Sequence, residues 1–159
     1  MYDWANSAFS TTVMAGFFPI FFEKYWSNPE LVDQSTFYLG VSNSAGSLIV
    51  AMMAPFLGAV SDTGSTKKKF LFTFAFLGIL ATSLLWFVEQ GDWQLAAILY
   101  AVGAIGFASS NVFYDSLLPS VAKKHEFDFV SSLGYSMGYL GGGVLFIINI
   151  LMYQNPQWF

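Results

Sequence analysis

The sequence contains no cysteine and no arginine, and its single histidine is His125. The absence of cysteine excludes disulfide bonds, zinc–thiolate sites and thiol catalysis within this chain. Charged residues make up 10% of the 159 residues, whereas a water-soluble domain usually carries about a quarter. So few charges exclude an ordinary soluble enzyme, and a hydrophobic content of 55% excludes intrinsic disorder. The net charge of -4 and the single basic run, Lys67–Lys69, also argue against nucleic-acid binding.

The sequence consists mainly of long apolar segments separated by short polar stretches. The five segments cover approximately residues 3–22, 36–60, 70–88, 93–118 and 129–153. Pro119 follows the fourth segment and is expected to end it. The third segment carries no charge and, as a helix, would be roughly 28 Å long, close to the hydrocarbon thickness of a bilayer. Membrane-spanning strands need only about 10 residues and alternate in polarity, which these segments do not. We therefore expect an all-α membrane protein with five transmembrane helices.

The basic residues predict how these helices are oriented. Lys67–Lys69 precede the third segment and Lys123–Lys124 precede the fifth, so five of the six lysines lie on connections of the same parity. Because cytoplasmic loops carry an excess of lysine and arginine, we expect these connections and the N-terminus to be cytoplasmic. The first segment lacks a basic leader and is interrupted by Asp3 and Asn6, so it is interpreted as a retained span and not as a signal peptide.

Polar residues inside the apolar segments are the strongest functional signal, because polar groups are costly in hydrocarbon. Helical spacing places two such groups on single faces: Asp3, Asn6, Ser7 and Ser10 in the first span, and Asn111, Tyr114 and Asp115 in the fourth. One interpretation is a polar cavity between helices that holds a solute. The other is that Asp3 caps a helix while the amide and hydroxyl groups bond neighbouring helices, and that Asp115 is hydrated or pairs with a loop lysine.

Small residues predict close helix packing in two other spans. The second span carries such a face, formed by Asn43, Ser47, Ala51, Ala54 and Gly58, and Pro55 removes one hydrogen bond from the same helix. The fifth span opens with Gly134, Gly138 and Gly141–Gly143. So many glycines weaken a helix unless something packs tightly against it. A static contact and a sliding interface both fit this pattern.

Enzymatic signatures are missing from the sequence. GYLGGG lacks the lysine and hydroxyl residue of a nucleotide phosphate loop, and neither a nucleophile elbow nor a cluster of metal ligands occurs. His125 lies in a hydrophilic loop beside Lys124 and Glu126, where a solvated histidine is the expected role. We therefore expect neither enzymatic activity nor a cofactor or metal site.

Three stretches resemble a known family. Gly58–Lys69 resembles the loop between helices two and three of the major facilitator superfamily, with Gly58, Asp62 and the lysines in place. Tyr2–Thr12 is similar to the first helix of the vacuole-effluxer-like branch, which in bacteria is called the unknown-major-facilitator family. Phe113–Pro119 and Ser131–Gly143 resemble the fourth and fifth helices of that branch.

The chain also departs from the patterns of that family. In the loop motif, Thr63 replaces a basic residue and Ser65 a glycine. Asp115 stands where an amide is more usual, and Tyr139 replaces the proline of an antiporter motif in the fifth helix. The last departure removes support for an antiport mechanism.

The resemblance implies a twelve-helix fold of two six-helix halves. Residues 1–159 then look like a partial N-terminal transmembrane domain, five helices of a six-helix half, whose partner is the C-terminal half of the same protein. In such a fold, the loop with Gly58, Asp62, Lys67 and Lys68 would act in gating. The expected solute contacts are Asn6, Ser10, Asn111 and Tyr114.

The function expected from these observations is secondary active transport of a small polar solute by alternating access. Amino acids are the substrate class that the resemblance implies, with an ion or solute gradient as the energy source and the plasma membrane as the location. A non-transporting assembly protein is the alternative, with helix packing through Gly134, Gly138, Gly142 and Gly143. An intramembrane enzyme ranks lowest, because no histidine lies within a span.

Overall fold

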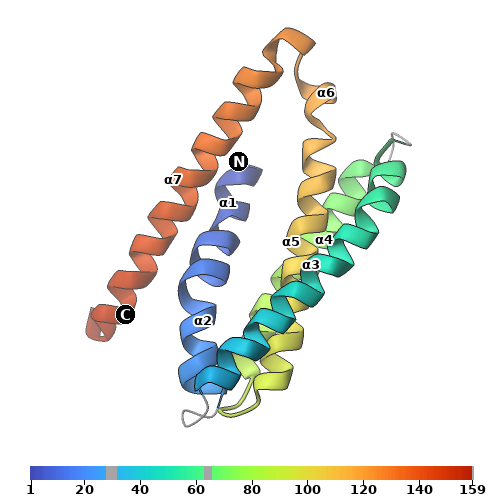
Figure 1. The fold of residues 1–159 in the computed structure, drawn as a ribbon. Coiled ribbons are helices and arrows are strands. Elements are labelled where there is room, and N and C mark those ends of the chain that lie inside the picture. Colours follow the sequence, from blue (N-terminus) through green and yellow to red (C-terminus); the bar gives the residue numbers. More distant parts are fainter. Residues whose placement is uncertain (28–31, 63–65, 159) are drawn as a thin grey trace. The chain divides into compact units, whose positions relative to one another are not determined.

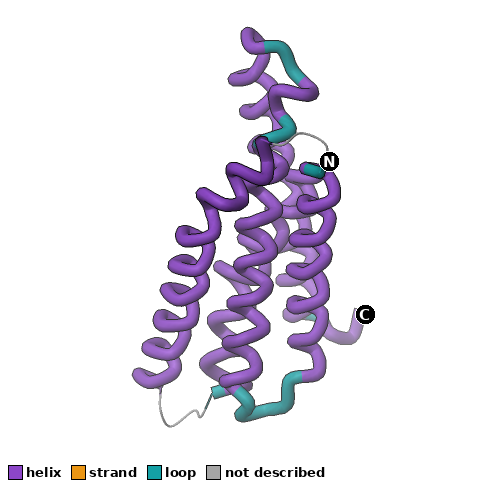
Figure 2. Tube along the Cα trace, turned by 90° about the vertical axis from the view of Figure 1, so that its right-hand side faces the viewer, coloured by secondary structure: helices purple, strands orange, loops and turns teal. Residues whose placement is uncertain are grey.

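The computed structural model of the chain describes residues 1–27, 32–62 and 66–158. The side chains of residues 32–35 and 61–62 lie outside this description, so the side chain of Asp62 and all of Thr63–Ser65 cannot be placed. Helices account for nearly all of the described residues, and no strand occurs among them (Figure 2). The expectation of an all-α protein is therefore confirmed.

Within the described residues, four helices are long and apolar enough to cross a membrane, whereas five were expected. These candidate spans cover Thr36–Val60, Lys67–Phe87, Trp93–Asp115 and Lys124–Gln154. The first expected span is instead divided into α1 (Tyr2–Ala8), the π-helix η1 (Phe9–Phe17), α2 (Phe18–Phe21) and the π-helix η2 (Phe22–Trp26). Its hydrogen-bond register changes repeatedly, so none of its pieces alone has the length of a transmembrane α-helix.

The chain divides into two compact units, which are described separately. One unit contains Met1–Ile20 and the chain from Ala122 onward, and the other contains Phe21–Val121. In the second unit, α3 (Val32–Asp62), α4 (Lys67–Leu84) and α5 (Trp93–Asp115) lie side by side (Figure 1). The 3-10 turn η4 (Leu85–Phe87) ends α4, and the short helix α6 (Leu118–Val121) follows α5.

Helix α5 forms the core of the second unit, because it packs against both α3 and α4. Its contact faces are built mainly from small residues, and the fully buried positions include Ala96, Ser109, Ser110 and Phe113. A Cβ atom on Gly106 would lie 2.7 Å from the backbone N of Gly78 in α4. The two helix backbones are therefore in direct contact, which only small residues allow.

In the first unit, α7 (Phe127–Gln154) packs along α1 and η1 (Figure 1). Gly138 and Gly142 face this contact, and both are buried. The ring of Phe146 contacts that of Phe17 edge to face, with centroids 6.1 Å apart. The helices thus approach closely at the two glycines, and aromatic rings fill the space between them further along α7.

Two helix boundaries differ from those expected. Lys67–Lys69 form the first turn of α4, although the sequence placed them in a loop. Helix α5 ends at Asp115 instead of 118, and Pro119 lies inside α6 instead of acting as the stop. Proline is tolerated in the first turn of a helix, where its missing N–H has no intrahelical partner. Helix α5 instead passes into a turn after Asp115, where the backbone N–H groups of Ser116 and Leu117 donate to the carbonyl groups of Val112 and Tyr114.

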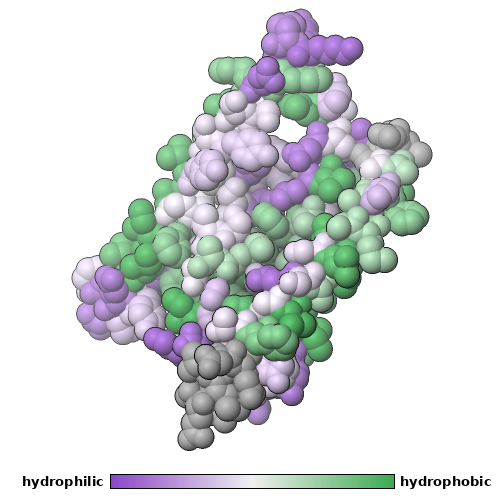
Figure 3. All heavy atoms as spheres, viewed as in Figure 1, coloured by the Kyte–Doolittle hydropathy of each residue, from purple (hydrophilic) through white to green (hydrophobic). Residues whose placement is uncertain are grey.

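Large apolar side chains are exposed along most of the helices. Phe56 is 74% exposed, Trp86 87% and Tyr139 77%, and the apolar colouring covers broad areas of the helix faces visible in Figure 3. Exposure on this scale would be unfavourable in water but matches a hydrocarbon environment, where lipid tails are as apolar as the side chains. With the four candidate spans, it identifies an integral membrane protein.

Candidate functional site

The polar face of the first span lies on α1 and the beginning of η1. The Ser10 hydroxyl donates to the carbonyl of Ser7 at 2.9 Å, and the Thr11 hydroxyl donates to the same carbonyl at 3.0 Å. Ser7 lies two residues before the first residue of the π-helix η1, so two hydroxyl groups stabilise the backbone near that junction. The Ser10 oxygen keeps lone pairs that can accept a bond from a solute donor.

Asn6 lies one turn before Ser10, at the end of α1. Both residues are half-buried, as are Asp3 and Ser7 of the same face. The first unit therefore holds two of the four expected solute contacts on one helical stretch. The sequence did not reveal Thr12 as a member of this region, yet its hydroxyl oxygen is buried and, within the described residues, without a hydrogen-bond partner.

The glycines of α7 contact oxygen atoms of α1 and η1. A Cβ atom on Gly138 would lie 2.5 Å from the Ser7 Oγ, and one on Gly142 would lie 2.8 Å from the Thr11 Oγ1. Gly141 contacts Trp4 even more closely. Gly134 is half-buried in α7. Gly143 lies outside this contact, because a Cβ atom on it would have no described neighbour within 4 Å.

Asn111 and Tyr114 lie one turn apart near the end of α5, and both are half-buried. They belong to the second unit, and Asp115 beside them is exposed. Ser109 and Ser110 were not singled out from the sequence, although both are fully buried. The Ser110 hydroxyl donates to the Phe107 carbonyl at 2.8 Å. In the described structure, the Ser109 hydroxyl oxygen has no partner, an arrangement that is costly in a buried environment.

The expected gating residues lie at the adjoining ends of α3 and α4. Gly58 occupies the last turn but one of α3, and no described atom lies within 4 Å of where its Cβ would be. The backbone of Asp62 ends α3, and its side chain lies outside the described residues. Lys68 is exposed in the first turn of α4.

Lys67 has a specific partner on another helix. Its ammonium group donates a hydrogen bond of 2.9 Å to the carbonyl of Ser116, the residue that caps the C-terminus of α5. The Ser116 hydroxyl in turn donates to the Phe113 carbonyl at 2.7 Å. A cation at a helix C-terminus is favourable because unsatisfied carbonyl groups concentrate negative partial charge there. The first residue of α4 thus supplies a donor for the carbonyl group of the C-cap of α5.

Aromatic residues gather at the opposite ends of these helices. The rings of Tyr38 in α3 and Trp93 in α5 are stacked, with centroids 4.1 Å apart and planes inclined by 13°. The Trp26 indole N–H donates to the Val88 carbonyl at 3.3 Å. Further into α5, a side-chain hydrogen bond joins Tyr100 and Asn43. Rings with one polar end are typical of membrane–water interfaces.

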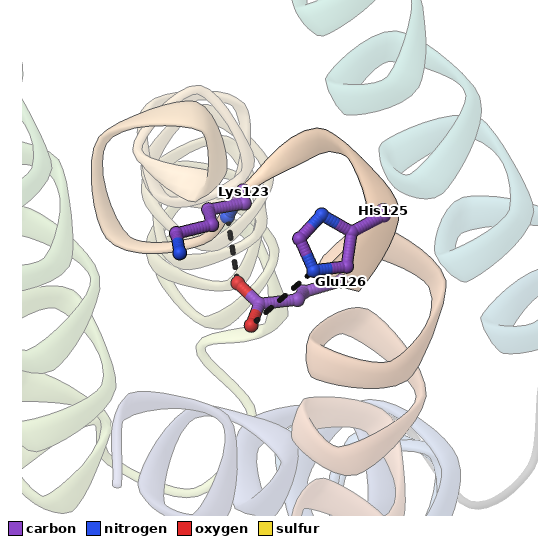
Figure 4. A network of polar contacts seen from close by, with 3 residues as sticks. All are labelled: Lys123, His125 and Glu126. Atoms are coloured by element: carbon purple, nitrogen blue, oxygen red, sulfur yellow. Dashed lines mark hydrogen bonds and ion pairs between the residues drawn. The ribbon is translucent and has the colours of Figure 1, made fainter.

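His125 lies in a small polar network at the start of the last long helix (Figure 4). The backbone N–H of Lys123 donates to Glu126 Oε2 at 2.9 Å, and His125 Nε2 lies 3.8 Å from Glu126 Oε1. The histidine side chain is 75% exposed. This arrangement caps the short helix that begins at Lys124. No group of three potential metal ligands lies together in the described part of the chain.

Comparison with known proteins shows which family the sequence is similar to. Residues 32–128 match the family described as vacuole effluxer Atg22-like. The chain is 39% identical over 158 residues to an uncharacterized MFS-type transporter of Bacillus subtilis, covering 99% of this chain and 37% of that protein. It is 30% identical over 157 residues to an uncharacterized protein of Aquifex aeolicus, covering 99% of this chain and 38% of that protein.

A eukaryotic relative is more distant. Autophagy-related protein 22 of Coccidioides immitis is 34% identical over 76 residues, covering 48% of this chain and 13% of that protein. No solved structure matches the chain. This chain thus spans little more than a third of the length of the bacterial relatives. Because the family match covers more than half of the chain and includes α3, α4 and α5, the chain belongs to the vacuole effluxer Atg22-like family of MFS-type membrane transporters.

Proposed function

We propose that this chain is part of a secondary active transporter that moves a small polar solute, of the amino acid class, by alternating access. The observation that carries the proposal is the family match over residues 32–128, which includes the loop motif and the polar end of α5. The MFS-type transporter of Bacillus subtilis supports it, since the similarity to that relative extends over nearly the whole chain. An ion or solute gradient supplies the energy.

Asn6, Ser10, Asn111 and Tyr114 are the proposed solute contacts. Their amide and hydroxyl groups can both donate and accept hydrogen bonds, as the ammonium and carboxylate of an amino acid require. All four are half-buried within apolar segments, where a polar side chain needs a polar partner. Asn111 and Tyr114 share a face of α5, so a single solute group can contact both.

Gly58, Asp62, Lys67 and Lys68 are the proposed gating residues. Asp62 ends α3, and a carboxylate at the C-terminus of a helix is unfavourable unless a basic group or a facing helix N-terminus compensates it. No described atom lies within 4 Å of where the Cβ of Gly58 would be, which would allow such a partner to approach closely. If this pairing forms in one access state only, it biases the equilibrium between the two states.

The proposed location is the plasma membrane, with the N-terminus in the cytoplasm and the C-terminal half of the same protein as partner. The lysines at the beginning of α4 and those before α7 support the orientation through the positive-inside rule. The family description refers to the vacuole, whereas the similarity to a protein of Bacillus subtilis, a bacterium without a vacuole, supports the plasma membrane.

Uptake into proteoliposomes tests the transport proposal. The intact protein is reconstituted, and a panel of radiolabelled amino acids is offered under an imposed proton or sodium gradient. Gradient-dependent uptake of at least one amino acid is expected, reduced at least tenfold by Asn111→Ala. The matched control is Ile98→Ala, because Ile98 is on the same helix but 60% exposed; uptake should be retained.

A non-transporting assembly protein predicts a different outcome. No solute would then move under any gradient, and a partner protein would co-purify in a fixed ratio. Gly138 and Gly142 already contact α1 and η1 of the same unit, which leaves less glycine surface for another protein. That pairing favours the transporter over the assembly protein.

A further inference from the structure

The two helical stretches of the first unit run in the same direction. A Cβ atom on Gly138 of α7 would lie 2.5 Å from Ser7 Oγ. A Cβ atom on Gly142 would lie 2.8 Å from Thr11 Oγ1. Four residues forward along α7 thus correspond to four residues forward along α1 and η1. Gly138 and Ser7 mark the line along which the two stretches face each other.

Two tyrosines of α7 lie to one side of this contact line. Tyr139 follows Gly138 by one residue, and Tyr135 precedes it by three. Because successive residues of an α-helix are rotated by about 100° around its axis, both tyrosines lie about a quarter-turn from the contact line, in the same sense. Tyr135 is 66% exposed and Tyr139 77%, so both phenol groups are accessible beside the contact.

Asn6 and Ser10 lie on the same side of the unit as the tyrosines. Asn6 precedes Ser7 by one residue, and Ser10 follows it by three, so both are rotated from the contact line in the opposite sense to the tyrosines. Since the two stretches face each other and run in the same direction, opposite rotations bring their side chains to one side. The first unit therefore presents two proposed solute contacts and two tyrosines on one surface.

The other side of α7 is apolar. Val144 and Ile148 lie there by helical spacing from Gly138, and they are 46% and 41% exposed. Side chains of this kind suit contact with lipid tails. The first unit is thus polar on the side of Asn6 and apolar on the side of Val144.

The tyrosine hydroxyl groups require a polar partner from outside their own helix. A serine in a helix can bond its own backbone, as the Ser136 hydroxyl does to the Ser132 carbonyl at 2.8 Å. The ring of a tyrosine holds its hydroxyl away from that backbone. Tyr139 also lies near the middle of α7, away from the membrane boundaries where tyrosine is common. The ring alone would tolerate lipid, but an unbonded hydroxyl group in hydrocarbon is costly.

We propose that Tyr135 and Tyr139 belong to the solute-binding surface of the first unit and donate hydrogen bonds to the carboxylate of the transported amino acid. The inference rests on the proposed function and names the groups that recognise its substrate. The tyrosines are one turn apart on one face, so the two oxygens of one carboxylate can accept from both. The oxygens of Asn6 and Ser10 then accept from the ammonium group. Hydrogen bonds to charged groups are the stronger kind.

Cysteine labelling tests whether the tyrosine side faces water. This chain contains no cysteine, so Tyr139→Cys provides a single reporter in it once any cysteines elsewhere in the intact protein are replaced. The probe is a methanethiosulfonate reagent with a trimethylammonium group, present on both sides of proteoliposomes. Tyr139→Cys should react at least tenfold faster than Val144→Cys, the matched reporter on the apolar side. Equal rates, or slower reaction at position 139, would overturn the proposal.

Transport kinetics test the hydrogen bond itself. Tyr139→Phe removes the hydroxyl group and keeps the ring, and it should raise the KM for amino acid uptake by a factor of about ten or more while kcat changes less than twofold. Tyr135→Phe should act in the same direction. Tyr153→Phe is the matched control, because Tyr153 is 73% exposed on the same helix but lies next to its last residue; its KM should stay within a factor of about two of the parent.

A substrate analogue separates recognition from a structural effect. The amide of the transported amino acid lacks the carboxylate charge, so it should compete poorly with uptake by the parent protein. In Tyr139→Phe this disadvantage should shrink at least fivefold, because the group that distinguishes carboxylate from amide is gone. An unchanged disadvantage, or an unchanged KM in both phenylalanine variants, would overturn the assignment of the tyrosines. If the parent takes up no amino acid, the proposed function itself is contradicted.

Discussion

The ammonium group of Lys67 lies 2.9 Å from the carbonyl oxygen of Ser116, joining the first residue of α4 to the C-cap of α5. A lysine at a helix N-terminus is unfavourable for its own helix, because the N-terminus carries positive partial charge. The ammonium group lies instead at the C-terminus of the neighbouring antiparallel helix, where the partial charge is negative and a cation is favourable. The ammonium group of Lys67 thus belongs to the first turn of α4 and is bonded to the C-cap of α5.

Substitution of Gly142 by alanine is expected to destabilise the first unit. The added methyl group would lie 2.8 Å from Thr11 Oγ1 and 3.1 Å from the Ser7 carbonyl oxygen, closer than carbon and oxygen normally approach. Overpacking of this kind costs about 1–3 kcal/mol. The midpoint of thermal unfolding in detergent, followed by tryptophan fluorescence, should fall accordingly.

Gly143→Ala provides the control for that experiment, one residue away in the same helix. No described atom lies within 4 Å of its Cβ position, so the substitution should leave stability unchanged or raise it by up to about 1 kcal/mol through the helix propensity of alanine. Equal losses for Gly142→Ala and Gly143→Ala would show that the contact with Thr11 is not the cause.

Removal of the Phe113 ring should weaken the joint between α4 and α5. Phe113 is fully buried and stacked against Phe70 and Phe74. Replacing a buried phenylalanine by alanine costs about 3–5 kcal/mol. Phe56→Ala, at a position 74% exposed on α3, should have little effect on the thermal midpoint. If both substitutions lower the thermal midpoint equally, the stacked rings between α4 and α5 stabilise the protein no more than an exposed phenylalanine does.

The sequence predicted the α-helical membrane fold because long uncharged segments leave few alternatives in a bilayer. It did not predict the π turns of the first span. In those turns Ser10 and Thr11 bond the Ser7 carbonyl, and α7 packs against the same stretch. Packing between helices is a tertiary effect, which spacing along one segment does not reveal. Likewise, the bond between Lys67 and the C-cap of α5 joins residues that are 49 positions apart, and helical spacing does not reveal such a pair.

The candidate site was only partly accessible to sequence reasoning. Helical spacing correctly places Asn111 and Tyr114 one turn apart, since periodicity is a local property. The buried hydroxyl groups of Thr12 and Ser109 were missed, because serine and threonine are common in membrane helices and spacing alone does not show which are buried. The proposed roles of all eight residues stay predictions, for the solute contacts Asn6, Ser10, Asn111 and Tyr114 as for the gating residues Gly58, Asp62, Lys67 and Lys68.

The stacked rings of Tyr38 and Trp93 should stabilise the pairing of α3 with α5. Their centroids are 4.1 Å apart, and aromatic pairs contribute about 0.5–1.5 kcal/mol beyond the area they bury. A double-mutant cycle of Tyr38→Ala and Trp93→Ala isolates this term in thermal unfolding. The same cycle between Tyr38 and Trp86, which is 87% exposed, should give no interaction energy. Additive effects in the first cycle would contradict a stabilising stack.

The orientation of α4 can be tested with cysteines at its two ends. Lys68→Cys lies in the first turn of α4, and Glu89→Cys lies beyond its end, where the side chain is exposed. In right-side-out membrane vesicles, a membrane-impermeant maleimide should label position 89 and leave position 68 unlabelled until the vesicles are permeabilised, because the positive-inside rule predicts a cytoplasmic location for the lysine-rich end. His125→Cys should behave like position 68, since Lys123 and Lys124 lie beside it. Labelling of position 68 from outside would invert the proposed topology, and it would move Asp62 and Lys68 away from any cytoplasmic gate.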